Sequence, residues 1–195
     1  MLVIISGPSG VGKDTIIRAL KRRHPSAERH FVVTYKTRER RPAETDGVDY
    51  HFVSEDEFAA MKEQGAFLEA TEVHGHWAGT PRDQVGGALE AGRDTVLKID
   101  VRGAETVKEQ VPDALRIFVA PPSLEELIGR LRDRGTETPE EQDRRRRDAA
   151  TELAHQDDYD YVLINETGQA ERTADQIDGI ITAERARHAD RRIAL

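Results

Sequence analysis

Three things are missing from this 195-residue sequence, and each absence excludes a class of protein or site. There is no cysteine, which excludes disulfide bonds, thiolate catalysis and cysteine-ligated metals. No stretch approaches the ~20 apolar residues of a membrane-spanning helix, and the opening MLVIIS is too short, and lacks the basic start, for a signal peptide. There is no excess of positive charge, since the net charge is -8, which argues against general nucleic-acid binding. We therefore expect a cytoplasmic protein with no nucleic-acid or membrane partner.

What is present suits one globular domain. Hydrophobic residues make up 37% of the chain and charged residues 34%, and a chain of this length can bury a sizeable core. Short apolar runs alternate with longer polar stretches. The runs that indicate buried strands are 2–5, 95–99, 115–119 and 161–164, and the stretches that indicate helices are 13–23, 82–92, 102–111, 123–134 and 139–156. This alternation predicts an α/β fold with a parallel sheet covered on both faces.

The stretch 31–80 interrupts that alternation. It contains the strand-like pieces FVVTY and YHFV, followed by a short helix that Ser54 and Glu57 would open as a capping box. Ser123 and Glu126 have the same spacing and predict a second capping box, at the start of the helix over 123–134. We therefore expect an inserted piece of mixed structure between two helices of the main fold.

The first functional motif is GPSGVGKDT at residues 7–15, between an apolar run and a helix-like stretch. It fits the phosphate-loop pattern G-x-x-x-x-G-K-[ST] except that Asp14 occupies the hydroxyl position. In such a loop, backbone N–H groups ring the phosphates and the lysine reaches the β- and γ-phosphates. The alternative is an ordinary glycine-rich turn, but motif and context agree on a triphosphate site. The residues predicted to bind ATP are Gly7, Ser9, Gly10, Val11, Gly12, Lys13, Asp14 and Thr15.

Asp14 leaves two interpretations open. A carboxylate beside a polyphosphate is repelled unless a cation lies between them, so Asp14 could take part in binding Mg²⁺, with the Thr15 hydroxyl one position later. Alternatively, Asp14 only favours the first turn of its helix by its interaction with the helix dipole. With either interpretation we expect ATP and Mg²⁺ as cofactors and keep Asp14 and Thr15 as candidate metal ligands.

A second group of motifs follows the loop. These motifs are TRERRP (37–42), DGVDYHFVS (46–54), FLE (67–69), GHWAGTP (75–81) and IDVRG (99–103). In order and spacing they resemble the guanylate kinase family, whose members typically read T-T-R-x-x-R-P-G-E-x-x-G-x-D-Y-x-F-V-S and later G-x-Y-Y-G-T. The resemblance runs from residue 2 to about residue 183.

The resemblance implies a P-loop NTPase-type, doubly wound parallel sheet with an inserted nucleotide-monophosphate-binding lobe and a helical lid. The ranges it implies are a single domain over 1–185, with a core of 1–33, 82–124 and 150–185, an acceptor-binding lobe of 34–81 and a lid of 125–149, then a charged tail of 186–195. It implies a nucleoside monophosphate kinase of purine nucleotide metabolism that transfers a phosphoryl group in line from MgATP to GMP, and to dGMP. ATP and GMP would be its partners, and it would be a monomer or a homodimer.

Side-chain chemistry supports the implied acceptor site. Arg38 and Arg41 can grip a phosphate bidentately, and Tyr50 can donate its hydroxyl to the same phosphate. Ionised Glu69 only accepts hydrogen bonds, which suits the adjacent N1–H and 2-amino donors of guanine. The resemblance completes the predicted substrate site, which consists of Thr34, Arg38, Arg41, Tyr50, Glu69, Thr80 and Asp100.

The arginine-rich stretch from Arg130 to Arg147 resembles the lid of the family. Phosphoryl transfer needs positioning and charge neutralisation, and the acceptor phosphate is itself ionised, so no general base is required. We expect three lid arginines to close over the triphosphate, although an exposed basic helix paired with nearby acidic residues is the alternative. The predicted catalytic set is Lys13, Arg38, Arg130, Arg134 and Arg146.

The sequence departs from the family pattern mainly on the acceptor side. Ala78 stands where the family has a second tyrosine that touches the acceptor phosphate, and Tyr35 and Lys36 replace small hydroxyl residues. Thr34 replaces a serine, and Lys98 stands where an acidic residue is usual. Losing one charge-assisted hydrogen bond costs about 1.5–3 kcal/mol, which would weaken acceptor binding without abolishing it. An inward-pointing Lys36 would restore some positive potential.

Two other functions stay open from the sequence. Ribose 1,5-bisphosphate phosphokinases are similar to guanylate kinases and often have G-K-D in the loop and Y-x-T-R further on, as this chain has at 12–14 and 35–38. A non-catalytic guanylate-kinase-like binding module is the other alternative, although such modules typically degrade the phosphate loop. His74 and His76 could share a strand face, but no third ligand is evident nearby and we expect no transition-metal site.

Overall fold

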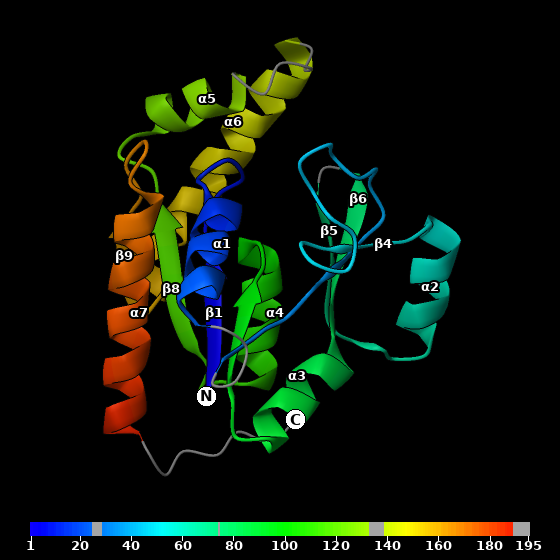
Figure 1. The fold of residues 1–195 in the computed structure, drawn as a ribbon. Coiled ribbons are helices and arrows are strands. Elements are labelled where there is room, and N and C mark those ends of the chain that lie inside the picture. Colours follow the sequence, from blue (N-terminus) through cyan, green and yellow to red (C-terminus); the bar gives the residue numbers. More distant parts are fainter. Residues whose placement is uncertain (25–28, 74, 133–138, 189–195) are drawn as a thin grey trace.

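The core of the molecule is a five-stranded sheet in which all neighbouring strands are parallel (Figure 1). The computed structural model describes residues 1–24, 29–73, 75–132 and 139–188, with the side chains of 139–145 left out of the description. The strands of the core sheet, in spatial order, are β2 (Arg29–Phe31), β7 (Asp94–Lys98), β1 (Leu2–Ser6), β8 (Leu115–Ala120) and β9 (Tyr161–Ile164). The predicted α/β fold with a parallel sheet is confirmed.

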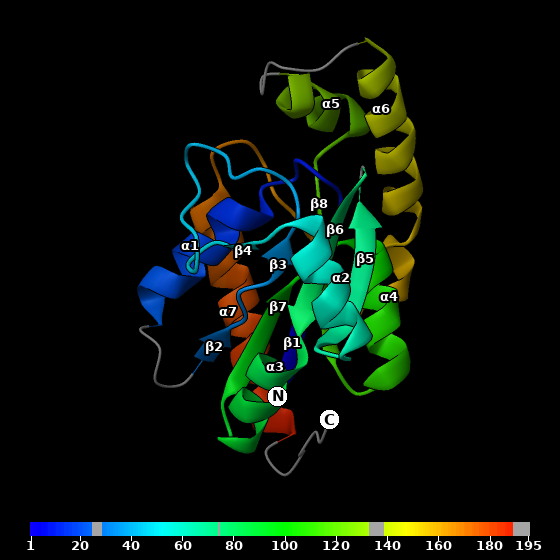
Figure 2. The same cartoon turned by 90° about the vertical axis from the view of Figure 1, so that its right-hand side faces the viewer.

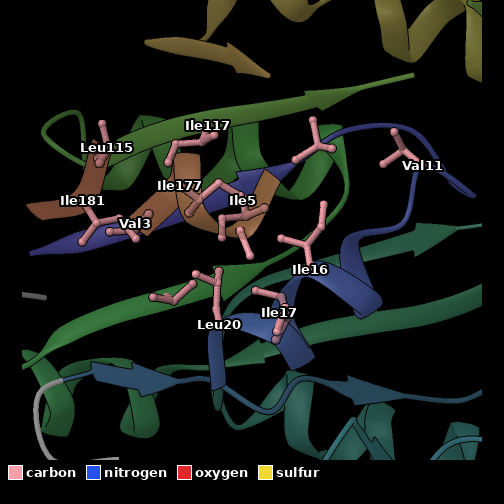
Figure 3. Close-up of a cluster of buried hydrophobic side chains, with 14 of the residues drawn as sticks. Val3, Ile5, Val11, Ile16, Ile17, Leu20, Leu115, Ile117, Ile177 and Ile181 are labelled. Carbon is pink, nitrogen blue, oxygen red and sulfur yellow. The ribbon is translucent and has the colours of Figure 1, made fainter. Parts of the chain in front are cut away.

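Alternation along the central strand explains why helices cover both faces of this sheet. Val3 and Ile5 of β1 pack against α1 (Lys13–Arg23) and α7 (Ala170–Arg187), the cluster drawn in Figure 3. Leu2 and Ile4 point to the opposite face, toward α3 (Arg82–Glu90) and α4 (Val101–Gln110). All four side chains are fully buried, and burying each stabilises the fold by about 1.5–3 kcal/mol. Because β1 is buried on both faces, its sequence is a continuous apolar run, and this run is what predicted the strand.

A second, smaller sheet stands beside the core (Figure 2). Its strands, in spatial order, are β4 (His51–Phe52), β3 (Tyr35–Lys36), β6 (His76–Pro81) and β5 (Phe67–Val73). The predicted strand FVVTY is divided, because β2 ends at Phe31 and β3 begins at Tyr35. No hairpin was predicted over β5 and β6, although the motifs within it were noted and His74 and His76 were considered as neighbours on one strand face. This sheet and α2 (Glu55–Glu63) form the inserted piece that the sequence indicated.

The predicted capping box of α2 is confirmed. The Ser54 hydroxyl accepts from the Glu57 backbone N–H at 3.2 Å, and the Glu57 carboxylate accepts from the Ser54 backbone N–H at 2.8 Å. The second predicted box is only half formed. Ser123 accepts from the Glu126 backbone N–H at 3.1 Å, but the Glu126 carboxylate turns away to Arg130, which holds a charge that the Ser123 backbone lacks.

Two further helices rise above the carboxyl edge of the core sheet (Figure 1). They are α5 (Leu124–Arg132) and α6 (Pro139–Ala154), close to the predicted ranges, and a 3-10 turn, η1 (Gln156–Asp158), follows. None of the helices within the described residues combines the length and apolar character that crossing a membrane requires.

Candidate active site

A cavity of about 370 Å³ lies between the phosphate loop, the second sheet and the carboxyl end of β7. From the predicted ATP set its lining includes Ser9, Gly10, Val11, Gly12, Lys13, Asp14 and Thr15, and from the predicted substrate set Thr34, Arg38, Arg41, Tyr50, Glu69 and Asp100. Residues more than eighty positions apart in the chain thus share one wall. Gly7 begins the loop behind this lining, and Thr80 is buried behind Glu69.

The phosphate loop connects β1 to α1 and depends on glycine backbone geometry. Gly7, Gly10 and Gly12 have φ of 137°, 87° and 103°, a region that other residues rarely adopt. A Cβ on Gly12 would lie 2.6 Å from the Asn165 amide nitrogen, which itself donates to the Val11 carbonyl at 2.7 Å. The chain after β9 therefore holds the loop from behind and leaves its front face open to the cavity.

Lys13 is folded back over its own loop. Its ammonium donates to the backbone carbonyls of Gly7 and of Pro8, the latter at 3.1 Å. Burial lowers the pKa of Lys13, and nearby Glu152 and Asp14 oppose that effect. Glu152 of α6, which sequence reasoning missed, lines the cavity and accepts from the Ser9 backbone N–H at 3.3 Å. The Glu152 carboxylate therefore accepts from a backbone N–H of the loop, that of Ser9, which could otherwise donate to a phosphate.

Asp14 and Lys98, two departures from the family pattern, form one ion pair. The Lys98 ammonium lies 2.5 Å from Asp14 Oδ1, and the Tyr50 hydroxyl donates to the same oxygen at 2.7 Å. Burial alone would raise the pKa of Asp14, but the charge of Lys98 and these hydrogen bonds hold it well below its usual range. Asp14 does lie in the first turn of α1, as one interpretation required, yet its side chain has a specific partner that neither interpretation foresaw. The sequence did hint at this ion pair, because the two departures from the family pattern, Asp14 and Lys98, carry opposite charges.

The two predicted acceptor arginines are organised by Glu44, another residue that sequence reasoning missed. Arg38 donates to both carboxylate oxygens, with its Nη1 2.8 Å from Oε2 and its Nη2 2.5 Å from Oε1. The Arg41 backbone N–H also donates to Glu44 Oε2 at 2.9 Å. Burial raises the pKa of Glu44, but Arg38 and the Arg41 N–H outweigh it and the net pKa is lowered. Glu44 therefore fixes the loop that carries both arginines into the cavity wall.

Glu69 is buried at the other end of the cavity, with 4% of its surface exposed. Thr80 donates its hydroxyl to Oε1 at 2.6 Å, and Thr71 donates to Oε2 at 3.0 Å. Burial raises the pKa of Glu69 to about 7 despite these hydroxyls, and Asp100 adds to the increase. Each carboxylate oxygen keeps acceptor capacity beyond its threonine partner, so the pair can meet two adjacent donors.

Asp100 and Thr34 complete this end of the cavity. The Asp100 carboxylate caps α4 by accepting from the Gly103 backbone N–H at 2.9 Å. A Cβ added to Gly103 would lie 2.9 Å from Glu69 Oε2, so the absence of a side chain there lets α4 approach the carboxylate closely. Thr34 is buried and lines the cavity between the two sheets.

The predicted lid arginines do not line the cavity within the described part of the chain. Arg130 instead contacts the back of the loop region, because its Nη1 donates to the Val11 carbonyl at 3.4 Å and its Nη2 to the Asn165 carbonyl at 2.8 Å. Arg146 is exposed on α6. Arg134 lies outside the described residues, as does His74.

Comparison with known proteins gives a consistent result. The sequence matches the family model described as Guanylate kinase over residues 1–184. It is 44% identical over 186 residues to the guanylate kinase of Alkalilimnicola ehrlichii, covering 95% of this chain and 90% of that protein. It is 49% identical over 166 residues to the guanylate kinase of Mycobacterium leprae, covering 84% and 78%. A crystal structure of guanylate kinase from Anaplasma phagocytophilum superposes with a TM-score of 0.74 at 32% identity, covering 94% of this chain and 85% of that one.

Proposed function

Because this chain belongs to the guanylate kinase family and is a nucleoside monophosphate kinase, we propose that the cavity described above is where it transfers the γ-phosphate of ATP to GMP. One observation carries the assignment to this site. A single wall joins a lysine-bearing phosphate loop to a buried carboxylate that has two threonine donors, so a triphosphate and a base with two adjacent donors can be held together. We extend the proposal to dGMP, since no group at the Glu69 end is assigned to the ribose.

On the donor side, the loop backbone and Lys13 would bind the triphosphate. The loop residues from Ser9 to Thr15 line the cavity at the start of α1, where the helix dipole favours negative charge. Binding requires Lys13 to exchange the carbonyls of Gly7 and Pro8 for phosphate oxygens. It also requires Glu152 to release the Ser9 N–H. The phosphate is a stronger acceptor than a carbonyl, which favours the exchange.

We propose that Mg²⁺ reaches the site with ATP and that Thr15, rather than Asp14, is the loop side chain open to it. Asp14 Oδ1 already carries the Lys98 ammonium at 2.5 Å, and a divalent cation at the same oxygen would be repelled by that charge. Thr15 is exposed and lines the cavity, and its hydroxyl is a hard oxygen ligand of the kind Mg²⁺ accepts. The bound ion would offset the charge on the phosphates.

On the acceptor side, Arg38, Arg41 and Tyr50 would bind the phosphate of GMP. Glu44 holds the arginine loop in place, and Tyr50 would turn its hydroxyl from Asp14 toward the phosphate. Ionised Glu69 would accept from N1–H and the 2-amino group of guanine, which adenine does not offer side by side. Thr34 and Asp100 would help to read the base, and Thr80 would complete the substrate site by holding Glu69 in place.

Arg130, Arg134 and Arg146 stay proposed lid residues that neutralise charge on the migrating group. Arg130 is bonded to Val11 and Asn165, and Arg146 is exposed, so contact with the triphosphate requires a rearrangement of α5 and α6. Closure would exclude water and so suppress hydrolysis.

The division into core, lobe (34–81) and lid (125–149) belongs to this proposal. Three further predictions from the sequence also stay predictions: the cytoplasmic location, the monomeric or dimeric state, and the absence of nucleic-acid or membrane partners.

The test is ADP release from MgATP with GMP, dGMP, AMP, IMP or ribose 1,5-bisphosphate as the acceptor. We expect turnover with GMP and dGMP and little with AMP. The loop aspartate that suggested a sugar phosphate has its own partner in Lys98, so it no longer requires such an acceptor. Turnover with the sugar bisphosphate alone would show that Glu69 has been given the wrong role.

A further inference from the structure

Lys36 lies directly across from Ala78 on neighbouring antiparallel strands. The β3–β6 register pairs these two residues, and both line the cavity. Side chains directly opposite on such strands project from the same face, with Cβ atoms about 4.5–5.5 Å apart. The small side chain of Ala78 therefore leaves space beside the stem of Lys36, at the position where the sequence lacks the aromatic hydroxyl expected from the family pattern.

Three cations surround the ring of Tyr50, and Lys36 differs from the other two. Lys98 Nζ lies 3.9 Å from the ring centroid and is paired with Asp14. The Arg38 guanidinium carbon lies 5.5 Å from the centroid and its group is paired with Glu44. Lys36 Nζ lies 4.7 Å from the centroid, and within the described residues no hydrogen bond or ion pair holds it.

The surroundings of Lys36 favour an anion in the cavity. Burial, together with the charges of Arg38 and Lys98, lowers the pKa of Lys36 to about 8, while Asp14 and Asp100 act in the opposite direction. A partly buried ammonium beside two other cations gains from any anion that reaches it. The cavity wall around it already holds the groups that we assign to the acceptor phosphate, namely Arg38, Arg41 and Tyr50.

We propose that Lys36 binds the phosphate of the acceptor nucleotide directly and supplies the contact that is lost at Ala78. This inference rests on the proposed function. An ammonium donating to a phosphate is charged on both sides, whereas the tyrosine hydroxyl of the family pattern is neutral, so the contact is at least as strong as the one it replaces. The apparent weakening of the acceptor site that Ala78 suggested is thereby offset within the same pair of strands.

The test compares equilibrium binding of GMP with that of guanosine, which lacks the phosphate, by titration calorimetry. Replacing Lys36→Thr should lower the ratio of GMP affinity to guanosine affinity by roughly 10- to 100-fold, the loss expected for one charged contact. Guanosine affinity should fall much less, since Lys36 affects the base only by helping to keep Glu69 ionised. Adding Ala78→Tyr to Lys36→Thr should recover a large part of the ratio, and Lys36→Arg should retain it.

Lys62→Thr is the matched control, because Lys62 Nζ also stacks on an aromatic ring, that of Trp77 at 3.8 Å, but lies outside the cavity. It should change neither affinity. If circular dichroism shows that the Lys36→Thr variant is unfolded, Lys36→Met replaces it in the same comparison. An unchanged ratio, or an equal loss for GMP and guanosine, would overturn the proposal. Failure of the proposed function has a different signature, because the unmodified protein would then bind GMP no better than AMP.

Discussion

At the scale of single residues, the local charge beside the phosphate loop depends on the ion pair of Asp14 and Lys98 together. Asp14 brings a negative charge into the loop that we propose binds phosphate, and Lys98 pairs with it from the end of β7. The Lys98 side chain is only 11% exposed, so removing its partner leaves a largely desolvated ammonium. Neither residue can be understood from its own position in the sequence.

A double-mutant cycle that reverses the charge of Lys98 and removes that of Asp14 tests the pair. Lys98→Glu places a carboxylate beside Asp14 and the phosphates, and we expect a loss of kcat/KM of about 100-fold or more, from one lost charged contact plus repulsion. Asp14→Ser alone should cost roughly tenfold. The double variant should return to within a few-fold of Asp14→Ser, as measured by ADP release at saturating GMP.

The control for this cycle is Arg22→Glu, which breaks an exposed pair with Glu171 outside the cavity lining and should have little effect on turnover. If the losses of Lys98→Glu and Asp14→Ser simply add in the double variant, the two residues act independently and the pair has no functional meaning.

Glu69 predicts a dependence of base binding on pH. Its pKa of about 7 means that a lower pH protonates the carboxylate that must accept from guanine. Guanosine affinity should therefore fall about tenfold per pH unit below about 7. Using guanosine removes the titration of the GMP phosphate from the measurement. Guanosine affinity that stays constant from about pH 5 to 8 would contradict the assignment.

The same shift has a consequence for stability with a definite sign. Between the ordinary pKa of 4.5 and about 7, the folded protein keeps a proton on Glu69 that the unfolded chain has released. This contribution to the free energy of unfolding is present at low pH and is lost as pH rises through about 7. Glu69→Gln should remove that part of the pH dependence in urea unfolding.

At the scale of elements, the close approach of α4 to β5 positions Glu69, the carboxylate that we propose reads the base. Gly103→Ala adds a Cβ 2.9 Å from Glu69 Oε2, and two threonines restrain that carboxylate from moving away. We expect GMP affinity to fall severalfold, even though alanine favours the helix by up to about 1 kcal/mol. The measurement is GMP titration together with thermal unfolding.

Gly87→Ala in α3 is the matched helix variant, since a Cβ there meets nothing within 4 Å. It should gain the same helical preference without any change in GMP affinity. Equal GMP affinity in both variants would mean that the close approach of α4 does not set the position of Glu69.

The elements also show what could be predicted from the sequence. Four of the five core strands were predicted because they are apolar runs, such as LVII in β1. The fifth, β2, was not predicted as a core strand, because its sequence RHF has no apolar run. The β5–β6 hairpin was missed because Glu69 and Thr71 put polar side chains where an apolar alternation would have signalled a strand. Polar side chains that line the cavity interrupt the hydrophobic alternation of a strand. The segment could therefore be recognised from its motifs but not from its hydrophobic pattern.

At the scale of the whole molecule, the site exists only where two sheets meet. The phosphate loop leaves the carboxyl end of β1, while most of the proposed acceptor residues come from the second sheet and its loops (Figures 1 and 2). Asp100 is the exception, since it follows β7 of the core sheet. The motifs singled out residues that line one cavity from both sides, and the roles of these residues stay proposals. Their supporting contacts could not be predicted, because Glu152 reaches Ser9 and Lys98 reaches Asp14 across 143 and 84 positions of the chain. Such contacts depend on the packing of the fold and leave no local pattern.

The most direct measurement of the central claim follows the phosphoryl group itself. The protein is given ATP labelled in the γ-phosphate, with Mg²⁺ and equal amounts of GMP and ribose 1,5-bisphosphate, and the products are separated. We predict that the label appears in GDP, and that Lys13→Met abolishes this transfer. Label found in the sugar product or in inorganic phosphate, with GMP unchanged, would contradict the proposal that this cavity joins ATP to a guanine nucleotide.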